Sequence, residues 1–204
     1  MFIEEAKKAI ELEIEALQCL LNKIDENFEK AAELIKECAG RVVITGVGKS
    51  GHVGRKSAAT FASLGTPACF MHATEGIHGD LGMIAKEDIV IALSYSGGTE
   101  ETLNIISPIK QIGAKIIAVT GRPDSILARN SDIVLDIGVR KEADPLGLAP
   151  TSSTTATLAM CDALAIAVAV SRHFTAADFA RFHPGGSLGR KLRDEVKMAS
   201  GLNG

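Results

Sequence analysis

The chain has 204 residues, 46% of them hydrophobic, and its 25 acidic and 22 basic side chains give a formal net charge of -3. This length can bury one sizeable core, so we expect one domain. The sequence has no basic stripe, which argues against nucleic-acid binding, and its first residues lack the features of a signal peptide. Four cysteines without CxxC spacing are expected to be small buried side chains in a reducing, cytoplasmic compartment: Cys19, Cys38, Cys69 and Cys161.

Hydrophobic periodicity predicts two helices first and then strands that alternate with helices. The first helices are expected at 3–21 and 28–38. Strands are expected at 41–45, 67–71, 88–93, 115–120 and 133–137, and the remaining helices at 52–64, 100–112, 123–129, 154–170 and 176–182. The apolar run 156–170 contains Asp162 and is shorter than the ~20 residues that a membrane span needs, so it predicts a buried or interface helix.

Strands that are apolar on both faces are typical of a parallel sheet covered on both sides. We therefore predict an α/β fold, a doubly wound five-stranded parallel sheet in a Rossmann-like three-layer sandwich, with an N-terminal helical extension. Ligands bind such sheets at the carboxyl ends of the strands. The loops expected there are 46–51, 72–80, 94–99, 121–123 and 138–155.

The stretch 94–102 lies between a predicted strand and a predicted helix. Its hydroxyls, Ser94, Ser96 and Thr99, and its small residues suit an anion at the positive end of the helix. Glu101 follows directly, which is unexpected beside a site that only binds phosphate. The arrangement is explained if this loop binds the phosphate group of a substrate whose reaction takes place at nearby residues.

The turn 46–51 matches GxGxxG after the first strand. A dinucleotide site is only weakly indicated, because no acid clearly ends the second strand. A P-loop is excluded, because Val43 stands where that motif needs a glycine. The turn then presents Lys49 and Ser50, either as a solvated lysine or as a cation held over a reacting oxyanion.

Three further loops contain candidate residues. His72 and His78 suggest a substrate contact more than a metal site, and a satisfied loop histidine is the alternative. Glu142 follows the last strand and is either surface charge or a proton shuttle, whose desolvation would raise its pKa. The hydroxyls of 151–155 exceed what capping one helix requires, and His183 is a turn histidine or a fixed functional group.

Together these motifs resemble the sugar isomerase (SIS) domain family and, within it, the arabinose-5-phosphate isomerases. The segments that carry the resemblance are GVGKSGHVGRKSAATFASLGTPA (46–68), HATEGIHGDLGM (72–83), SYSGGTEE (94–101), TGRPDS (120–125), KEADPLGLAPTSSTTATL (141–158) and HPGGSLGRKL (183–192). The resemblance implies helices at 1–39 that are part of the domain, an isomerase domain at 40–193 and a short tail at 194–204.

The implied reaction interconverts D-ribulose 5-phosphate and D-arabinose 5-phosphate through an enediolate, for 3-deoxy-D-manno-octulosonate in lipopolysaccharide or capsule. It requires no cofactor. The implied catalytic residues are Lys49, Glu101, Glu142 and His183. Lys49 would stabilise the enediolate, Glu101 would position Lys49 or a sugar hydroxyl, and Glu142 would shuttle the proton. His183, from a neighbouring subunit, would assist ring opening or proton transfer between oxygens. The implied substrate contacts are Ser50, Gly65, Thr66, His78, Ser94, Ser96 and Thr99, and His72 corresponds to a position of inhibitory zinc. A homotetramer with shared active sites is also implied.

The chain departs from the family pattern at two points. It ends at Gly204, where many relatives continue into two regulatory cystathionine-β-synthase-type domains, so we expect a short form. It also has Tyr95 and Gly98-Thr99 where relatives often have Asn and Glu-Ser.

Two alternatives to the implied function stay open. They are a non-catalytic sugar-phosphate-binding regulator and an isomerase for a hexulose or heptose phosphate.

Overall fold

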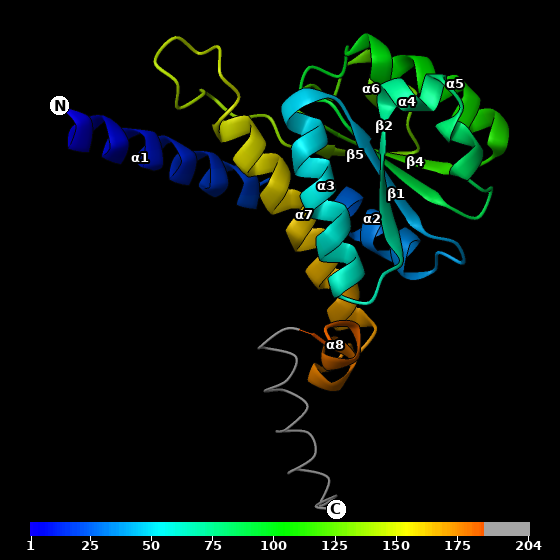
Figure 1. Ribbon diagram of the computed structural model, residues 1–204. Helices are drawn as coiled ribbons and strands as arrows, with labels where there is room; N and C mark the ends of the chain where they lie inside the picture. The colour runs from blue at the N-terminus through cyan, green and yellow to red at the C-terminus, as the bar shows by residue number, and fades with distance from the viewer. Residues whose placement is uncertain (186–204) are drawn as a thin grey trace, which may run out of the picture.

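A five-stranded parallel sheet forms the centre of the computed structural model, which describes residues 1–185 (Figure 1). The strands are β1 (Val42–Gly46), β2 (Ala68–His72), β3 (Ile89–Leu93), β4 (Lys115–Thr120) and β5 (Ile133–Asp136), in the order β2-β1-β3-β4-β5. Every neighbouring pair is parallel. The predicted fold class and strand number are therefore confirmed.

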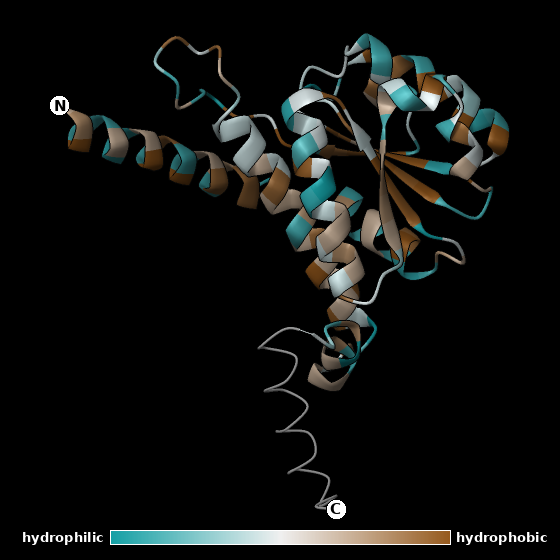
Figure 2. Cartoon of the chain, in the orientation of Figure 1, coloured by the Kyte–Doolittle hydropathy of each residue, from teal (hydrophilic) through white to brown (hydrophobic). Residues whose placement is uncertain are grey.

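Helices cover both faces of the sheet. They are α1 (Phe2–Leu21), α2 (Glu26–Lys36), α3 (Gly48–Ser63), α4 (Ala73–Ile77), α5 (Glu100–Ile112), α6 (Ile126–Arg129), α7 (Ser152–Ser171) and α8 (Ala176–Phe182), with a 3-10 turn η1 (Asp80–Met83). One core cluster joins the sheet to α2, α3 and α7, and a second joins it to α4, α5 and α6. Figure 2 shows the resulting brown, hydrophobic strands between helices of mixed hydropathy.

The alternation of side chains along β1 explains the two clusters. Ile44 faces the α7 side and Val43 faces the α5 side, and both are fully buried. All residues of β1 and β3 are buried, whereas β2 is an edge strand and largely half-buried. A strand buried on both faces reads as a continuous apolar run, which is why the periodicity located these central strands well.

The long apolar helix α7 packs against α1, α2 and α3. By length and composition it could cross a membrane, but half of its most apolar window is buried inside the protein. A core helix of a soluble protein passes the same test. Contacts with three helices account for its composition.

The chain differs from the sequence prediction at several element boundaries. The helix expected at 52–64 begins at Gly48, within the segment expected as a loop at 46–51, and the helix expected from 123 begins at Ile126. The segment expected as a loop at 72–80 contains α4 and the start of η1, because Nδ1 of His72 accepts a hydrogen bond from Thr74 N at 3.3 Å and caps α4. The second helix begins at Glu26 and not at 28, because the Asp25 carboxylate accepts from Asn27 N at 2.8 Å and forms the N-cap. The predicted tail, 194–204, lies outside the described residues.

Candidate active site

A cavity of about 510 Å³ opens at the carboxyl edge of the sheet. It is lined by Val47, Lys49, Ser50, Tyr95, Arg122, Val139, Arg140, Lys141, Glu142, Gly147, Leu148, Pro150, Ser153, Thr154 and Thr157. These residues come from the loops after β1, β3, β4 and β5 and from the first turns of α3 and α7. Of the predicted site residues, the cavity brings together Lys49, Ser50 and Glu142.

Lys49 reaches the cavity from the first turn of α3. The chain turns sharply from β1 into this helix, and Gly48 takes the left-handed conformation with φ of 57°. A Cβ on Gly51 would lie 3.0 Å from the carbonyl oxygen of Gly46, so glycine at this position allows the helix to start close to the strand. The Lys49 side chain is exposed, and the first turn of α3 contains no acidic residue.

Tyr95 joins the loop after β3 to the loop after β5. Its hydroxyl accepts a hydrogen bond from Val139 N at 3.1 Å and donates one to Val139 O at 3.3 Å. Its ring lies against Gly121, where a Cβ would come within 2.4 Å of a ring carbon. Both hydrogen bonds of the hydroxyl are therefore made within the protein. Tyr95 lines the cavity and also holds the loop that contains Val139.

Three further contacts hold the segment from β5 to α7. Lys23 donates to Asp136 Oδ2 and to the carbonyl oxygen of Gly138, each at 2.8 Å. Arg140 pairs with Glu15 of α1 at 3.0 Å. Within the loop, one oxygen of Asp144 accepts from Leu148 N at 2.8 Å and from Ala149 N at 3.0 Å. A loop with this many contacts presents Glu142 in a defined place.

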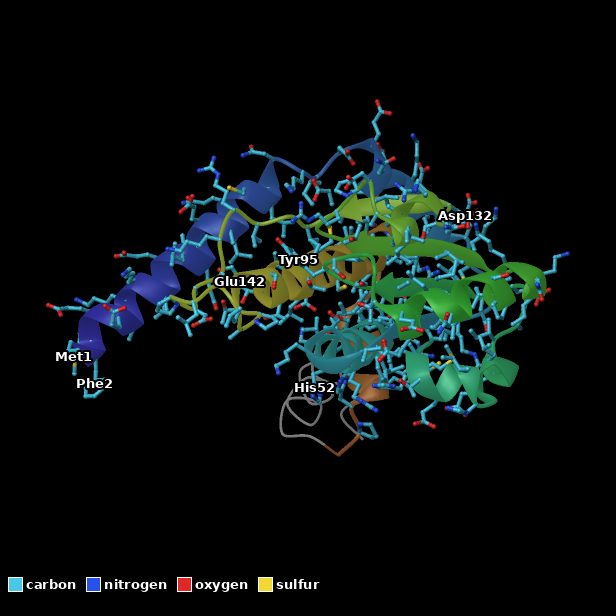
Figure 3. All side chains as sticks on the ribbon, turned by 90° about the horizontal axis from the view of Figure 1, so that it is seen from above. Met1, Phe2, His52, Tyr95, Asp132 and Glu142 are labelled. Atoms are coloured by element: carbon cyan, nitrogen blue, oxygen red, sulfur yellow. The ribbon has the colours of Figure 1, made fainter. Side chains whose placement is uncertain are left out.

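Glu142 lies against the amino end of α7, close to Tyr95 on the same cavity (Figure 3). Its Oε2 accepts from Thr151 N at 2.9 Å, Thr151 Oγ1 at 3.1 Å and Ser153 N at 3.1 Å. Burial by itself would raise the pKa of this carboxyl, but hydrogen bonds from Ser153 and Thr151 outweigh burial and lower the pKa. The expectation of a raised pKa was therefore wrong, because it counted desolvation and not the donors at the helix start.

Cations dominate the charge around the cavity. Lys49, Arg122, Arg140 and Lys141 line it together with a single acidic side chain, Glu142. Arg140 is paired with Glu15, whereas no ion pair to Lys49, Arg122 or Lys141 occurs in the described part of the chain. The positive end of α3 adds to this charge, so the cavity suits an anionic ligand.

The hydroxyl loop after β3 bonds mainly to itself. Ser94 is 3% exposed; its Oγ lies 2.8 Å from Thr99 Oγ1 and accepts from Gly97 N at 3.1 Å. Ser96 is exposed, and its hydroxyl accepts from Gly98 N at 3.2 Å. Ser94 thus shapes the turn, and Ser96 is the hydroxyl most open to a ligand. Their contact with a substrate stays a prediction.

Glu101 lies in the first turn of α5 and is not among the residues that line the cavity with Lys49. Its positioning role stays a prediction. No role was predicted for Arg122 or Arg140. For Thr151 and Ser153, the prediction was only that the hydroxyls of 151–155 exceed what capping requires and could serve helix packing or sugar contacts. Each of them lies in or next to a predicted loop at a strand end, and that position was the available signal.

Three predicted residues lie at the other end of the molecule from the cavity. Gly65 and Thr66 precede β2, and Thr66 Oγ1 accepts from Arg172 at 3.1 Å. His183 follows α8, stacks on Phe179 with ring centroids 3.8 Å apart, and its Nδ1 lies 2.8 Å from Phe179 O. Figure 1 shows α8 at the opposite end of α7 from the cavity loop, and a helix of this length spans about 30 Å. One chain therefore does not bring these residues to Glu142.

The histidines of the 72–83 segment do not form a metal site by themselves. Nδ1 of His72 caps α4, and His78 is exposed. Over residues 1–185, no group of three or more His, Cys, Asp or Glu side chains is placed to hold a metal ion. A zinc ion at His72 would need ligands from elsewhere, and we derive no chemistry from it.

Comparison with known proteins places the chain in a family. The profile of the SIS domain matches residues 35–167, which is more than half of the sequence. The chain belongs to the SIS domain family. Lys49 and Glu142 both line the cavity of this SIS domain, and their catalytic roles stay predictions.

Curated relatives of this SIS protein include arabinose 5-phosphate isomerase KdsD of Francisella tularensis, 56% identical over 93% of this chain and 59% of that protein. KdsD of Pseudomonas aeruginosa is 54% identical over 98% of this chain and 63% of that protein. The chain thus spans about three fifths of the length of these relatives. A solved structure, Escherichia coli CFT073 c3406 in complex with arabinose 5-phosphate, matches with a TM-score of 0.87 and 43% identity, over 90% of this chain and 97% of that one.

Proposed function

We propose that the chain is an isomerase that interconverts D-ribulose 5-phosphate and D-arabinose 5-phosphate. The observation that carries the proposal is that Lys49 and Glu142 line one cation-rich cavity at the carboxyl edge of the sheet. The KdsD relatives and the complex of c3406 with arabinose 5-phosphate support the choice of sugar phosphate.

Aldose–ketose isomerisation moves a proton between neighbouring carbons. In the proposal, the Glu142 carboxylate takes a proton from C1 of the open-chain ketose and returns it to C2. The hydroxyl proton on O1 passes to O2, a transfer that His183 of a neighbouring subunit would assist. The intermediate is an enediolate, and the ammonium group of Lys49 stabilises its oxyanion. The lowered pKa keeps Glu142 ionised at neutral pH, as a base must be. Because hydrogen moves as a proton, the proposed reaction needs no redox cofactor.

The phosphate would be held between the cations of the cavity and the exposed hydroxyl of Ser96. Lys141 and Arg122 offer charge, and the start of α5 offers backbone N–H groups. Glu100 and Glu101 in the same turn weaken the attraction of that helix for an anion. We therefore propose that the cavity cations and the Ser96 hydroxyl bind the phosphate together with the start of α5, and that this helix end does not bind it alone.

We further propose that His183 acts in the cavity of a neighbouring subunit within a homotetramer. Large apolar side chains on α1 are exposed, among them Phe2 at 85% and Ile10 at 60%, and Val170 of α7 is 69% exposed. Between the two helices lies an apolar hollow of about 370 Å³ that includes Ile14 and Met160. Exposed patches of this kind mark interaction surfaces, and a second copy of the chain is the proposed occupant. A monomer in sedimentation at assay concentration would contradict this assembly.

The same proposal places the enzyme in the cytoplasm, in synthesis of lipopolysaccharide or capsule. The four cysteines are free in the structure, which suits a reducing compartment. Inhibition by zinc through His72 is part of the proposal, and a titration of activity with zinc, with His72→Ala as control, tests it.

Incubation of the chain with ribulose 5-phosphate and a panel of hexulose and heptose phosphates, with identification of the products, tests the activity. We expect arabinose 5-phosphate from the pentose and no turnover of the longer sugars. Binding of the sugars without turnover would instead indicate the non-catalytic regulator. Turnover of a longer sugar alone would indicate the other isomerase class.

A further inference from the structure

Thr151, the residue directly before α7, contacts Glu142 in two ways. Its backbone N–H donates to Glu142 Oε2 at 2.9 Å, and its hydroxyl donates to the same oxygen at 3.1 Å. The hydroxyl also accepts from Ala143 N at 2.8 Å, which fixes the backbone next to Glu142. Thr151 is the N-cap of α7, yet its side chain makes no capping bond to the helix. The hydroxyl also lies 3.4 Å from the carbonyl oxygen of Ala149, but its shorter hydrogen bonds join it to Glu142 and Ala143.

The two oxygens of Glu142 become inequivalent through these contacts. Oε2 accepts three hydrogen bonds, the third from Ser153 N at 3.1 Å. A carboxylate oxygen offers about two lone pairs, so an oxygen with three donors has no free direction for a further proton. A proton taken from a substrate carbon must therefore go to Oε1.

We propose that Thr151 is a positioning residue that holds Oε2 of Glu142 and so directs Oε1 to the substrate carbon. This inference rests on the proposed function, because it assigns the geometry of the same proton transfer. The hydroxyl of Thr151 can be removed by a conservative substitution, as can that of Ser153, whose side chain also lowers the pKa of Glu142.

Thr151→Val keeps the shape of the side chain and removes its hydroxyl, whereas Thr151→Ser keeps the hydroxyl. With one donor to the carboxylate lost, we expect the pKa of Glu142 in Thr151→Val to rise. The acid limb of the pH profile of kcat moves with it. At neutral pH we expect kcat to fall about tenfold, because Oε1 is less well directed, with little change in KM. Thr151→Ser should behave like the wild-type chain.

Thr155→Val is the matched control. Its hydroxyl donates to the carboxylate of Glu13 at 3.1 Å, in the next turn of the same helix, and it does not line the cavity. It removes the same kind of bond at the same length and should leave the pH profile unchanged. Equal losses of kcat in Thr155→Val and Thr151→Val, with unmoved pH profiles, would show a merely structural effect and overturn the inference.

A second readout does not depend on turnover. The carboxyl carbon of Glu142, assigned by its absence in Glu142→Gln, can be titrated by NMR in protein labelled at glutamate. Wild-type and Thr151→Ser should titrate at lower pH than Thr151→Val, and identical titrations would overturn the inference. If the wild-type chain turns over no sugar phosphate, the proposed function fails, while the titration still reports on the contact between Thr151 and Glu142.

Discussion

Removing one oxygen atom from Tyr95 should loosen the loop that presents Glu142. The hydroxyl bonds both the N–H and the carbonyl of Val139, three residues before Glu142. Tyr95→Phe keeps the ring, which still fits against Gly121, and leaves both backbone groups of Val139 without their partner. The change therefore separates the hydrogen bonds from the packing.

The size of the effect follows from the two bonds. A neutral hydrogen bond contributes about 0.5–1.5 kcal/mol net, so the pair contributes about 1–3 kcal/mol. Val139 is half-buried, so water replaces part of this, and we expect the free energy of unfolding to fall by about 1–2 kcal/mol. The local effect on the loop should be larger than the global one, because the N–H and the carbonyl of Val139 both bond to this one hydroxyl.

Urea unfolding measures the global loss, and hydrogen exchange of the Val139 amide measures the local one. We expect faster exchange at Val139, an unchanged m value and a several-fold lower kcat. Gly121→Ala is the complementary change, because it keeps the hydroxyl and displaces the ring, and it should be at least as destabilising. Wild-type exchange at Val139 in Tyr95→Phe would refute the assigned role of the hydroxyl.

Three other predictions follow from single contacts. Lys49→Ala should lower kcat by about 100-fold, the scale of one lost oxyanion donor, with a smaller change in KM, and near-normal turnover in a steady-state assay would remove Lys49 from the catalytic set. Arg172→Met should lower the free energy of unfolding by about 2 kcal/mol in urea titration, because the guanidinium bonds the carbonyl of Lys36 at 2.8 Å and Thr66 Oγ1 at 3.1 Å. Asp132 is subject to burial, which raises its pKa, but bonds from Lys115 and Ile116 N outweigh burial and lower it. Its stabilisation is thus present above its ordinary pKa and lost as the pH falls through the lowered one. Urea titrations between about pH 5 and 3 should therefore show a shallower loss in Asp132→Asn, and equal slopes would contradict this.

The strands of the sheet could be located from the sequence because the hydrophobicity of their residues follows directly from their burial. β1 and β3 are buried on both faces, and their sequences are accordingly almost entirely apolar. Positions at strand ends likewise placed Lys49 and Glu142 at one edge before any geometry was known. Short-range hydrogen bonds were harder to predict from the sequence. The cap on α4 depends on the rotamer of His72, which no periodicity records.

The electrostatic state of Glu142 could not be predicted from its own position. Its donors are nine and eleven residues away along the chain, and only folding brings them to its carboxylate. The family resemblance, in turn, carried over Gly65 and Thr66, although the turn before β2 lies at the amino edge of the sheet. A resemblance transfers residues without saying which chain of an assembly supplies them, and His183 raises the same question.

In the proposed isomerisation of ribulose 5-phosphate, Glu142 carries the proton. Incubation of Glu142→Gln and His183→Gln with this substrate in deuterated water, followed by NMR, measures the exchange of the carbon-bound proton. We predict that Glu142→Gln abolishes the exchange, while His183→Gln retains it when the open-chain sugar is available. Exchange at a near-normal rate in Glu142→Gln would contradict the assignment of Glu142 as the proton shuttle.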